Sequence, residues 1–132
     1  KFIGELSKLP IKLQKLIKLS EKKTRNKKSF QVNIAINYGS KIELINTIKK
    51  IKQKKIKLNE KNIDKNLYTK LLPDPDILIR TGDTHRLSNF LLWQLSYTEI
   101  FFEKKLWPDF KGKDFNKVLN KFKNIKRNFG SI

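Results

Sequence analysis

The chain is 132 residues long, has 38% hydrophobic residues, contains no cysteine and carries a formal net charge of +19. This length and apolar content suffice for one domain with a modest core, and the missing cysteines exclude disulfide bonds and fit a reducing compartment. No apolar stretch reaches the roughly 20 residues that a membrane-spanning helix needs, and no signal peptide is visible. The chain has no methionine and begins at Lys1, so we expect it to be a piece of a longer polypeptide.

The first half of the chain predicts two strands and two helices. Residues 2–4 are typical of the end of a strand, and the period-two alternation of apolar residues over 30–37 predicts a second strand. Between them, 9–19 has a proline in its first turn and apolar residues at helical spacing, which predicts a helix. Ser40 and the apolar residues that follow it at helical spacing, as far as residue 51, predict a capped amphipathic helix.

The second half of the chain continues the alternation of helices and strands. In chain order we predict a lysine-rich loop or helix tail at 52–61, a short helix within 62–72, a break at Pro73-Asp74-Pro75, a strand at 76–80, a helix at 89–97, a strand at 99–102, a turn at 107–110 and a helix at 114–129. Alternating strands and helices predict an α/β fold, with a mainly parallel sheet flanked by helices. The five glycines match neither of the common phosphate-binding loop patterns.

The positive charge comes almost entirely from lysine, since only four of the 31 basic residues are arginine. A charge of this size suits nucleic acid or an anionic membrane surface. The lysines spread along the whole chain, however, and the aromatic residues cluster in apolar runs and do not alternate with basic residues as stacking platforms would. We therefore expect a solvated lysine surface and no nucleic-acid partner. A basic nucleic-acid-binding domain is kept as an alternative.

Two of the four arginines lie close together in one segment, residues 80–89, which also holds the only histidine and a Ser-Asn pair. Arginine offers a rigid planar fork that binds phosphate or carboxylate through two parallel hydrogen bonds. The segment follows one apolar run and precedes another, which predicts a strand-to-helix turn, where open α/β sheets bind ligands. We interpret it as an anion-binding site. The structural alternatives are pairing of Arg80 and Arg86 with Asp74, Asp76 or Asp83, and a helix-capping role for Ser88.

Five segments resemble the cis-prenyltransferase family, and most closely its bacterial undecaprenyl diphosphate synthases. The most specific are PDPDILIRTG with HRLSNFLLWQLSYTE over residues 73–99 and LWPDF at 106–110. Upstream, IGELSKLP at 3–10 and VNIAINYG at 32–39 follow in the family's order, and RNFG at 127–130 is similar to its C-terminus. The resemblance implies an enzyme that adds isopentenyl diphosphate to an allylic diphosphate, usually farnesyl diphosphate, and makes a Z-polyprenyl diphosphate lipid carrier for cell-wall synthesis. It also implies Mg2+ as cofactor, an apolar product tunnel, a homodimer, and a cytoplasmic location that allows peripheral contact with the inner face of the membrane.

The resemblance assigns roles to individual residues by their positions. It implies that the diphosphate of isopentenyl diphosphate is bound by Arg80, Arg86 and Ser88. It implies that Glu99 and His85 lie near the metal ion, and glutamate oxygen is a ligand of the kind that Mg2+ prefers. Phe30 matches a position at the tunnel floor, where side-chain bulk limits product length. The resemblance also implies that the dimer interface contains Phe101, Phe102 and Trp107.

The chain departs from the family pattern at three places. The family's N-terminal portion, with its DGNGRW segment, does not occur in the sequence. We therefore expect residues 1–132 to be the C-terminal portion of a single cis-prenyltransferase domain, with an incomplete fold, no certain catalytic residue and no activity by itself. Thr84, beside Asp83, stands where the family often has Glu, and Ser40 stands where it often has a second Gly. A non-catalytic partner subunit of a cis-prenyltransferase is the main alternative function.

Overall fold

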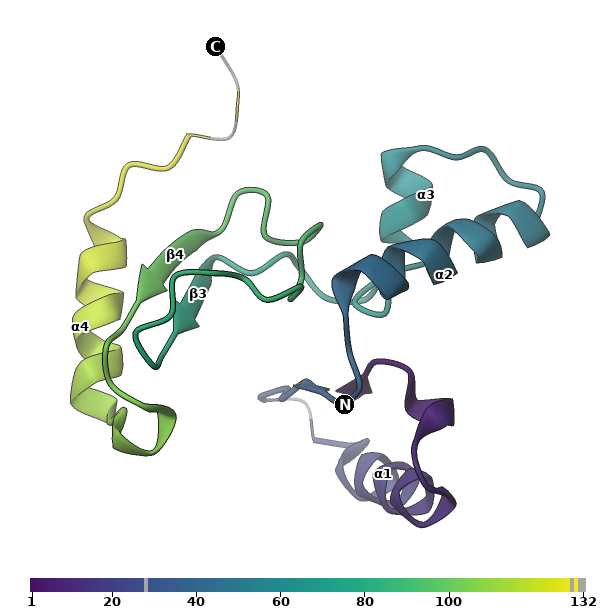
Figure 1. Cartoon of the computed structure of the whole chain (residues 1–132), viewed down its shortest axis with the longest axis horizontal. Coiled ribbons are helices and arrows are strands. Elements are labelled where there is room, and N and C mark those ends of the chain that lie inside the picture. The colour runs from purple at the N-terminus through teal and green to yellow at the C-terminus, as the bar shows by residue number, and fades with distance from the viewer. Residues whose placement is uncertain (28, 129, 131–132) are drawn as a thin grey trace. The chain divides into compact units, whose positions relative to one another are not determined.

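The computed structural model describes residues 1–27, 29–128 and 130 (Figure 1). The chain divides into two compact units, Lys1–Leu72 and Pro73–Ile132. Each unit contains one pair of parallel strands together with helices, so the predicted α/β class with parallel strands is confirmed. Within the described ranges, no helix combines the length and apolar character needed to cross a bilayer.

The first unit is built on a short strand–helix–strand crossover. Its elements in chain order are β1 (Phe2–Ile3), the 3-10 turn η1 (Leu6–Lys8), α1 (Ile11–Thr24), β2 (Ile34–Ala35), α2 (Ser40–Gln53) and α3 (Glu60–Asp64). β1 and β2 are parallel, with Phe2 opposite Ile34, and α3 packs against α2. The predicted strand at 30–37 is therefore wrong in its extent, because only a short part of it, Ile34–Ala35, pairs with a neighbouring strand.

The first predicted helix is confirmed as α1. Pro10 stands at the N-cap position with φ −52°. Proline has no backbone N–H, and this loses no hydrogen bond here because an N–H at the start of a helix has no acceptor within the helix. The side-chain amide of Gln14 donates to the carbonyl oxygens of Leu9 at 2.7 Å and Ser7 at 3.1 Å, which fixes the entry of the chain into the helix. Ile17 is the buried residue of this helix.

The second predicted helix is confirmed as α2, but its cap and its buried face differ from the prediction. The N-cap position is occupied by Gly39, so the helix has no side-chain cap. Ser40, the predicted cap, is the first helical residue and is fully buried. The buried positions repeat at helical spacing and are mostly polar: Ser40, Glu43, Thr47 and Ile51. Apolar spacing therefore located the helix and missed its buried face, because that face is set by polar partners elsewhere in the unit.

The connection after β1 requires glycine. Gly4 has φ +128°, and a Cβ atom at this position would lie 2.0 Å from the carbonyl oxygen of Ile36. Two hydrogen bonds hold the two segments at this spacing: the backbone N–H of Glu5 donates to the carbonyl of Asn37 at 3.1 Å, and the Asn37 amide donates to the carbonyl of Glu5 at 3.2 Å. The close approach leaves no room for a side chain.

We expect Gly4→Ala to lower the free energy of unfolding by more than about 1 kcal/mol, because alanine is strained at positive φ and its Cβ meets backbone atoms. Urea unfolding followed by circular dichroism measures the change. Gly112→Ala is the matched control, because a Cβ atom added there would meet nothing within 4 Å and the residue begins a helix. Equal effects of the two substitutions would contradict the tight junction at Gly4.

The second unit contains the strand pair that carries the predicted site. β3 (Ile77–Arg80) and β4 (Glu99–Phe102) are parallel and fully paired, from Ile77 opposite Glu99 to Arg80 opposite Phe102 (Figure 1). They are followed by the 3-10 turn η2 (Trp107–Asp109) and the helix α4 (Gly112–Lys123). Both predicted strands and the predicted turn are confirmed to within one residue at each end. The fully buried Val118 of α4 contributes to the core of this unit.

The predicted helix at 89–97 is wrong, and the predicted last helix is too long. Residues 88–97 form a series of turns in which Ser88, Asn89 and Leu91 have φ of 50°, 62° and 46°. Left-handed residues interrupt the right-handed helical repeat, so the apolar run cannot form a regular helix. α4 ends at Lys123, and Asn124 follows with φ −94° and ψ 0°. The predicted end at residue 129 lies outside the described residues.

Candidate anion-binding site

The arginine-containing segment begins at the carboxyl end of β3 and is fixed by backbone hydrogen bonds. The N–H of Glu103 donates to the carbonyl of Arg80 at 2.7 Å, the N–H of Gly82 donates to that of Lys105 at 2.8 Å, and the N–H of Asp83 donates to that of Glu103 at 3.1 Å. Gly82 and Asp83 adopt φ of +86° and +52°, which turns the chain sharply after Arg80. The strand pair and this turn thus hold the Arg80 backbone in a defined position.

Arg80 has a buried hydrogen-bond donor without an acceptor. Its Nε atom is inaccessible to solvent and has no hydrogen-bond partner among the described residues. No salt bridge of the described residues includes Arg80 or Arg86, and Asp76, one of the proposed structural partners, pairs with Arg127 at 2.5 Å. A buried guanidinium N–H without an acceptor is costly, so an anionic ligand at this position would stabilise the site.

The next predicted residues lie on the same loop. The His85 ring contacts the Phe102 ring at the carboxyl end of β4, with the ring centroids 4.8 Å apart. Arg86 and Ser88 are both exposed, and Thr84 is half-buried and donates from Oγ1 to the carbonyl of Gly82 at 3.1 Å. Because no helix begins after Ser88, the helix-capping alternative for this residue is wrong. The loop therefore presents two arginines, a histidine and a serine within nine residues.

Glu99 lies at the other end of the strand pair. It is half-buried, stands opposite Ile77, and its backbone N–H donates to the carbonyl of Asp76 at 3.1 Å. Phe102, against which His85 packs, is three residues further along β4, or about 10 Å at the usual rise of a strand. The structure thus separates Glu99 from His85. Among the described residues, no group of three or more Asp, Glu, His or Cys side chains is arranged to hold a metal ion, and the metal roles of Glu99 and His85 stay predictions.

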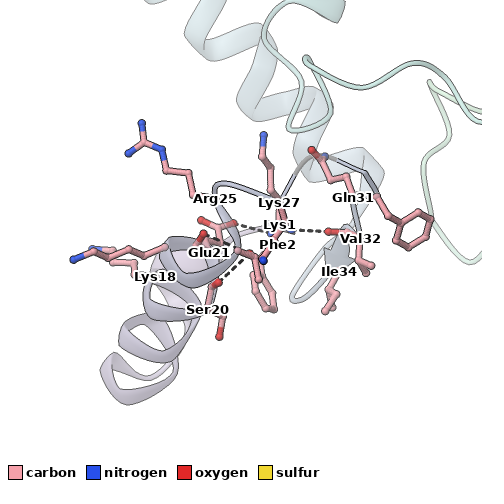
Figure 2. Close-up of a pocket in the computed structure, with 13 residues that line it drawn as sticks. Lys1, Phe2, Lys18, Ser20, Glu21, Arg25, Lys27, Gln31, Val32 and Ile34 are labelled. Carbon is pink, nitrogen blue, oxygen red and sulfur yellow. Dashed lines mark hydrogen bonds between the residues drawn. The ribbon is translucent and has the colours of Figure 1, made fainter.

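Phe30 is one of the residues that line an open hollow of about 720 Å3 in the first unit. Figure 2 shows this hollow, with Phe2, Val32 and Ile34 among its labelled residues. The side chain of Phe30 is 80% exposed, and the other apolar residues that line the hollow are Phe2, Val32 and Ile34. On the α1 side, Glu21 accepts a hydrogen bond from the backbone N–H of Phe2 at 2.9 Å. Phe30 therefore lines a large and partly apolar space, and its role in limiting product length stays a prediction.

The three residues assigned to a dimer interface differ in their exposure. Trp107 is 75% exposed and stacks on the Phe110 ring at a centroid distance of 6.4 Å. Phe102 is 39% exposed, whereas Phe101 is half-buried on the opposite face of β4. An exposed tryptophan and an exposed phenylalanine are apolar surface that a partner could cover, and the interface stays a prediction.

An ion pair close to the site was not predicted from the sequence. Lys105 donates from Nζ to Asp114 at 2.8 Å, and the backbone N–H of Lys111 donates to the other carboxylate oxygen of Asp114 at 2.9 Å. These contacts lower the pKa of the Asp114 carboxyl, with the Lys105 hydrogen bond as the main cause and the Lys111 hydrogen bond as the second. The signal in the sequence was an acidic residue in the first turn of a helix, which is typical of a capping box.

We expect the stabilisation from Asp114 to depend on pH. Because its pKa is lowered on folding, the native state favours the charged form; the stabilisation is present above the usual aspartate pKa of about 4 and is lost as the pH falls through the lowered value. Asp114→Asn should therefore destabilise the protein at pH 7, and the difference from wild type should shrink below about pH 4. Urea unfolding between pH 2 and 7 measures it, and a difference independent of pH would contradict the assignment.

Comparison with known proteins identifies the class of this chain. Residues 1–130 match the model of the prenyltransferase family described as "Putative undecaprenyl diphosphate synthase". With its parallel α/β fold and its arginine-containing loop at the carboxyl end of β3, the chain belongs to the undecaprenyl diphosphate synthase family of cis-prenyltransferases.

Several individual proteins are similar to the chain. The isoprenyl transferase of Oceanobacillus iheyensis is 42% identical, and the match covers 98% of this chain and 54% of that protein. The farnesyl-diphosphate-specific ditrans,polycis-undecaprenyl-diphosphate synthase of Wigglesworthia glossinidia brevipalpis is 43% identical, and the match covers 100% of this chain and 54% of that protein. The crystal structure of a probable undecaprenyl diphosphate synthase from Campylobacter jejuni has a TM-score of 0.90 at 42% identity, covering 99% of this chain and 62% of that one. The chain thus spans little more than half the length of these relatives.

Proposed function

We propose that the native polypeptide to which these residues belong condenses isopentenyl diphosphate with an allylic diphosphate, such as farnesyl diphosphate, to make a Z-polyprenyl diphosphate. In each condensation the allylic carbon–oxygen bond breaks, a carbon–carbon bond forms, diphosphate leaves and the isopentenyl unit loses a proton. Family membership supports this proposal, as do relatives whose names specify undecaprenyl diphosphate synthesis from farnesyl or geranylgeranyl diphosphate. A solved relative, the lavandulyl diphosphate synthase of Lavandula x intermedia, is a complex with dimethylallyl diphosphate.

The observation that carries the proposal is the buried Nε of Arg80 without an acceptor among the described residues. We assign the chain the half-site for isopentenyl diphosphate, with Arg80, Arg86 and Ser88 as its ligands. Two guanidinium groups and one hydroxyl donor would offset the two to three negative charges of a diphosphate. The exposure of Arg86 and Ser88 leaves both side chains free to reach a ligand that arrives from solvent.

The remaining assignments follow the same proposal. Phe30 would line the product tunnel, and its place beside the large hollow of the first unit supports this role. Glu99 and His85 would lie near the Mg2+ that assists the departure of diphosphate in this family, with Glu99 contributing a carboxylate oxygen. We assign these two side chains no step of the reaction. We further propose that residues 1–132 are the C-terminal portion of one domain and that the native protein is a cytoplasmic homodimer able to contact the membrane surface.

The experiment that tests the function uses the native polypeptide, purified as its source cell makes it. Incubation with labelled isopentenyl diphosphate, farnesyl diphosphate and Mg2+ should yield an extractable polyprenyl diphosphate, whose length is read by chromatography. Omission of the farnesyl diphosphate should abolish the product. Absence of product with the native polypeptide alone, restored by adding a separate catalytic chain, would instead support the non-catalytic partner subunit.

A further inference from the structure

A second cationic hollow lies in the second unit, apart from the arginines. Its volume is about 420 Å3, and its walls come from the segment after β4 and from α4. Four lysines line it, namely Lys104, Lys105, Lys117 and Lys121, and the carboxylates that line it are Glu103 and Asp114. The function proposed above gives no role to these lysines.

The lysines of α4 repel one another in their present positions. Lys117 and Lys121 are four residues apart and therefore lie on one face of the helix. Like charges at this spacing destabilise a helix. The salt bridges of the described residues include neither of them, nor Lys104 across the hollow. An anion bound in the hollow that these three lysines line would reduce the repulsion.

The carboxylates of the hollow do not balance this charge. Asp114 is buried and already accepts hydrogen bonds from Lys105 and from the backbone of Lys111. Glu103 is then the only other carboxylate among the described residues that line the hollow, together with three further lysines. Two positive charges therefore remain uncompensated in the hollow.

The wall of this hollow is connected to the arginine-containing loop. The carbonyl groups of Glu103 and Lys105, which line the hollow, accept hydrogen bonds from the backbone N–H groups of Asp83 and Gly82. Phe102 lines the hollow as well, and its ring contacts His85. The segment that lines the hollow is thus hydrogen-bonded to the arginine-containing loop.

We propose that this hollow is a second binding site for a phosphate-type anion, with Lys104, Lys117 and Lys121 as its charged donors. A diphosphate-sized anion fits the volume, and ammonium groups on flexible stems suit phosphate as point charges that adapt to its orientation. The same chemistry could come from a free phosphate or diphosphate, or from the phosphate headgroup of a lipid. The proposal does not depend on the proposed function, because it rests on residues outside the half-site.

The test compares two double variants of the native polypeptide in an Arg80→Ala background, which weakens the first anion site. Calorimetric titration with inorganic diphosphate at low salt measures the affinity. We expect Lys117→Gln/Lys121→Gln to weaken binding at least about 10-fold. Lys113→Gln/Lys123→Gln removes the same charge from the same helix at positions that do not line the hollow, and it should weaken binding less than about 2-fold. Equal weakening by both variants, or no binding in the Arg80→Ala background, would overturn the proposal.

Vesicles distinguish the two sources of the anion. If a lipid headgroup occupies the hollow, sedimentation with phosphatidylglycerol vesicles should fall in Lys117→Gln/Lys121→Gln but not in the control variant, and diphosphate should release the bound protein. If the ligand is a free anion, the two variants should sediment equally while their diphosphate affinities still differ. Since turnover is not part of either measurement, failure of this proposal leaves the proposed function standing, and the reverse also holds.

Discussion

Replacing Arg80 by alanine should lower kcat/KM for isopentenyl diphosphate at least about 100-fold in the native polypeptide. Each hydrogen bond between charged groups contributes about 1.5–3 kcal/mol, and a bidentate contact makes two of them. A loss of about 3 kcal/mol corresponds to a factor of more than 100. Because the Nε of Arg80 has no protein acceptor among the described residues, the loss should appear as weaker substrate binding and should leave the free energy of unfolding unchanged or raised. Steady-state kinetics and urea unfolding measure the two quantities.

Two further variants separate ligand binding from a structural role. Arg80→Lys keeps the charge but loses the planar fork, so it should recover only a small part of the activity. Lys12→Ala removes a positive charge from an exposed position of α1 that does not line either hollow described above, and it should change kcat/KM less than about 2-fold. Marked destabilisation by Arg80→Ala, with KM unchanged, would show that this arginine holds the fold and not a substrate.

Replacing Glu43 by alanine should produce the largest loss of stability, about 3 kcal/mol or more. Glu43 is fully buried, and its two carboxylate oxygens accept hydrogen bonds from Tyr38 Oη at 2.5 Å and from the backbone N–H of Tyr68 at 2.7 Å. Removal of a charged acceptor leaves both donors without this partner and opens a cavity, and each lost hydrogen bond to a charged group contributes about 1.5–3 kcal/mol. Chemical denaturation at pH 7 measures the change.

The surroundings of Glu43 supply the controls. Glu60→Ala removes an exposed carboxylate from the first turn of α3 and should cost less than about 1 kcal/mol. Tyr38→Phe should cost part of the Glu43 effect, and a double-mutant cycle with Glu43→Ala should give a coupling energy of at least about 0.5 kcal/mol. Additive effects of the two substitutions would contradict a direct hydrogen bond between these side chains.

Elements defined by local pattern were predicted well. The start of α1 after Pro10 and the strands β3 and β4 were located to within one or two residues, because apolar periodicity and a proline act over only a few positions. The helix at 89–97 failed because periodicity carries no information on the left-handed φ of Ser88, Asn89 and Leu91. An apolar run of this length also has too few hydrogen bonds to form a stable helix by propensity alone.

The sequence by itself determined the α/β class, the family and the segment in which the arginines lie, because these depend on the order of short local patterns. Only the tertiary structure decided which of the named residues lie together. Parallel pairing of β3 with β4 places His85 against Phe102 and leaves Glu99 at the opposite end of the strands, since register depends on contacts between segments 22 residues apart. The tertiary structure likewise buried the polar face of α2 and joined Lys117 and Lys121 to the segment after β4, because burial and charge compensation depend on neighbours that are distant in sequence.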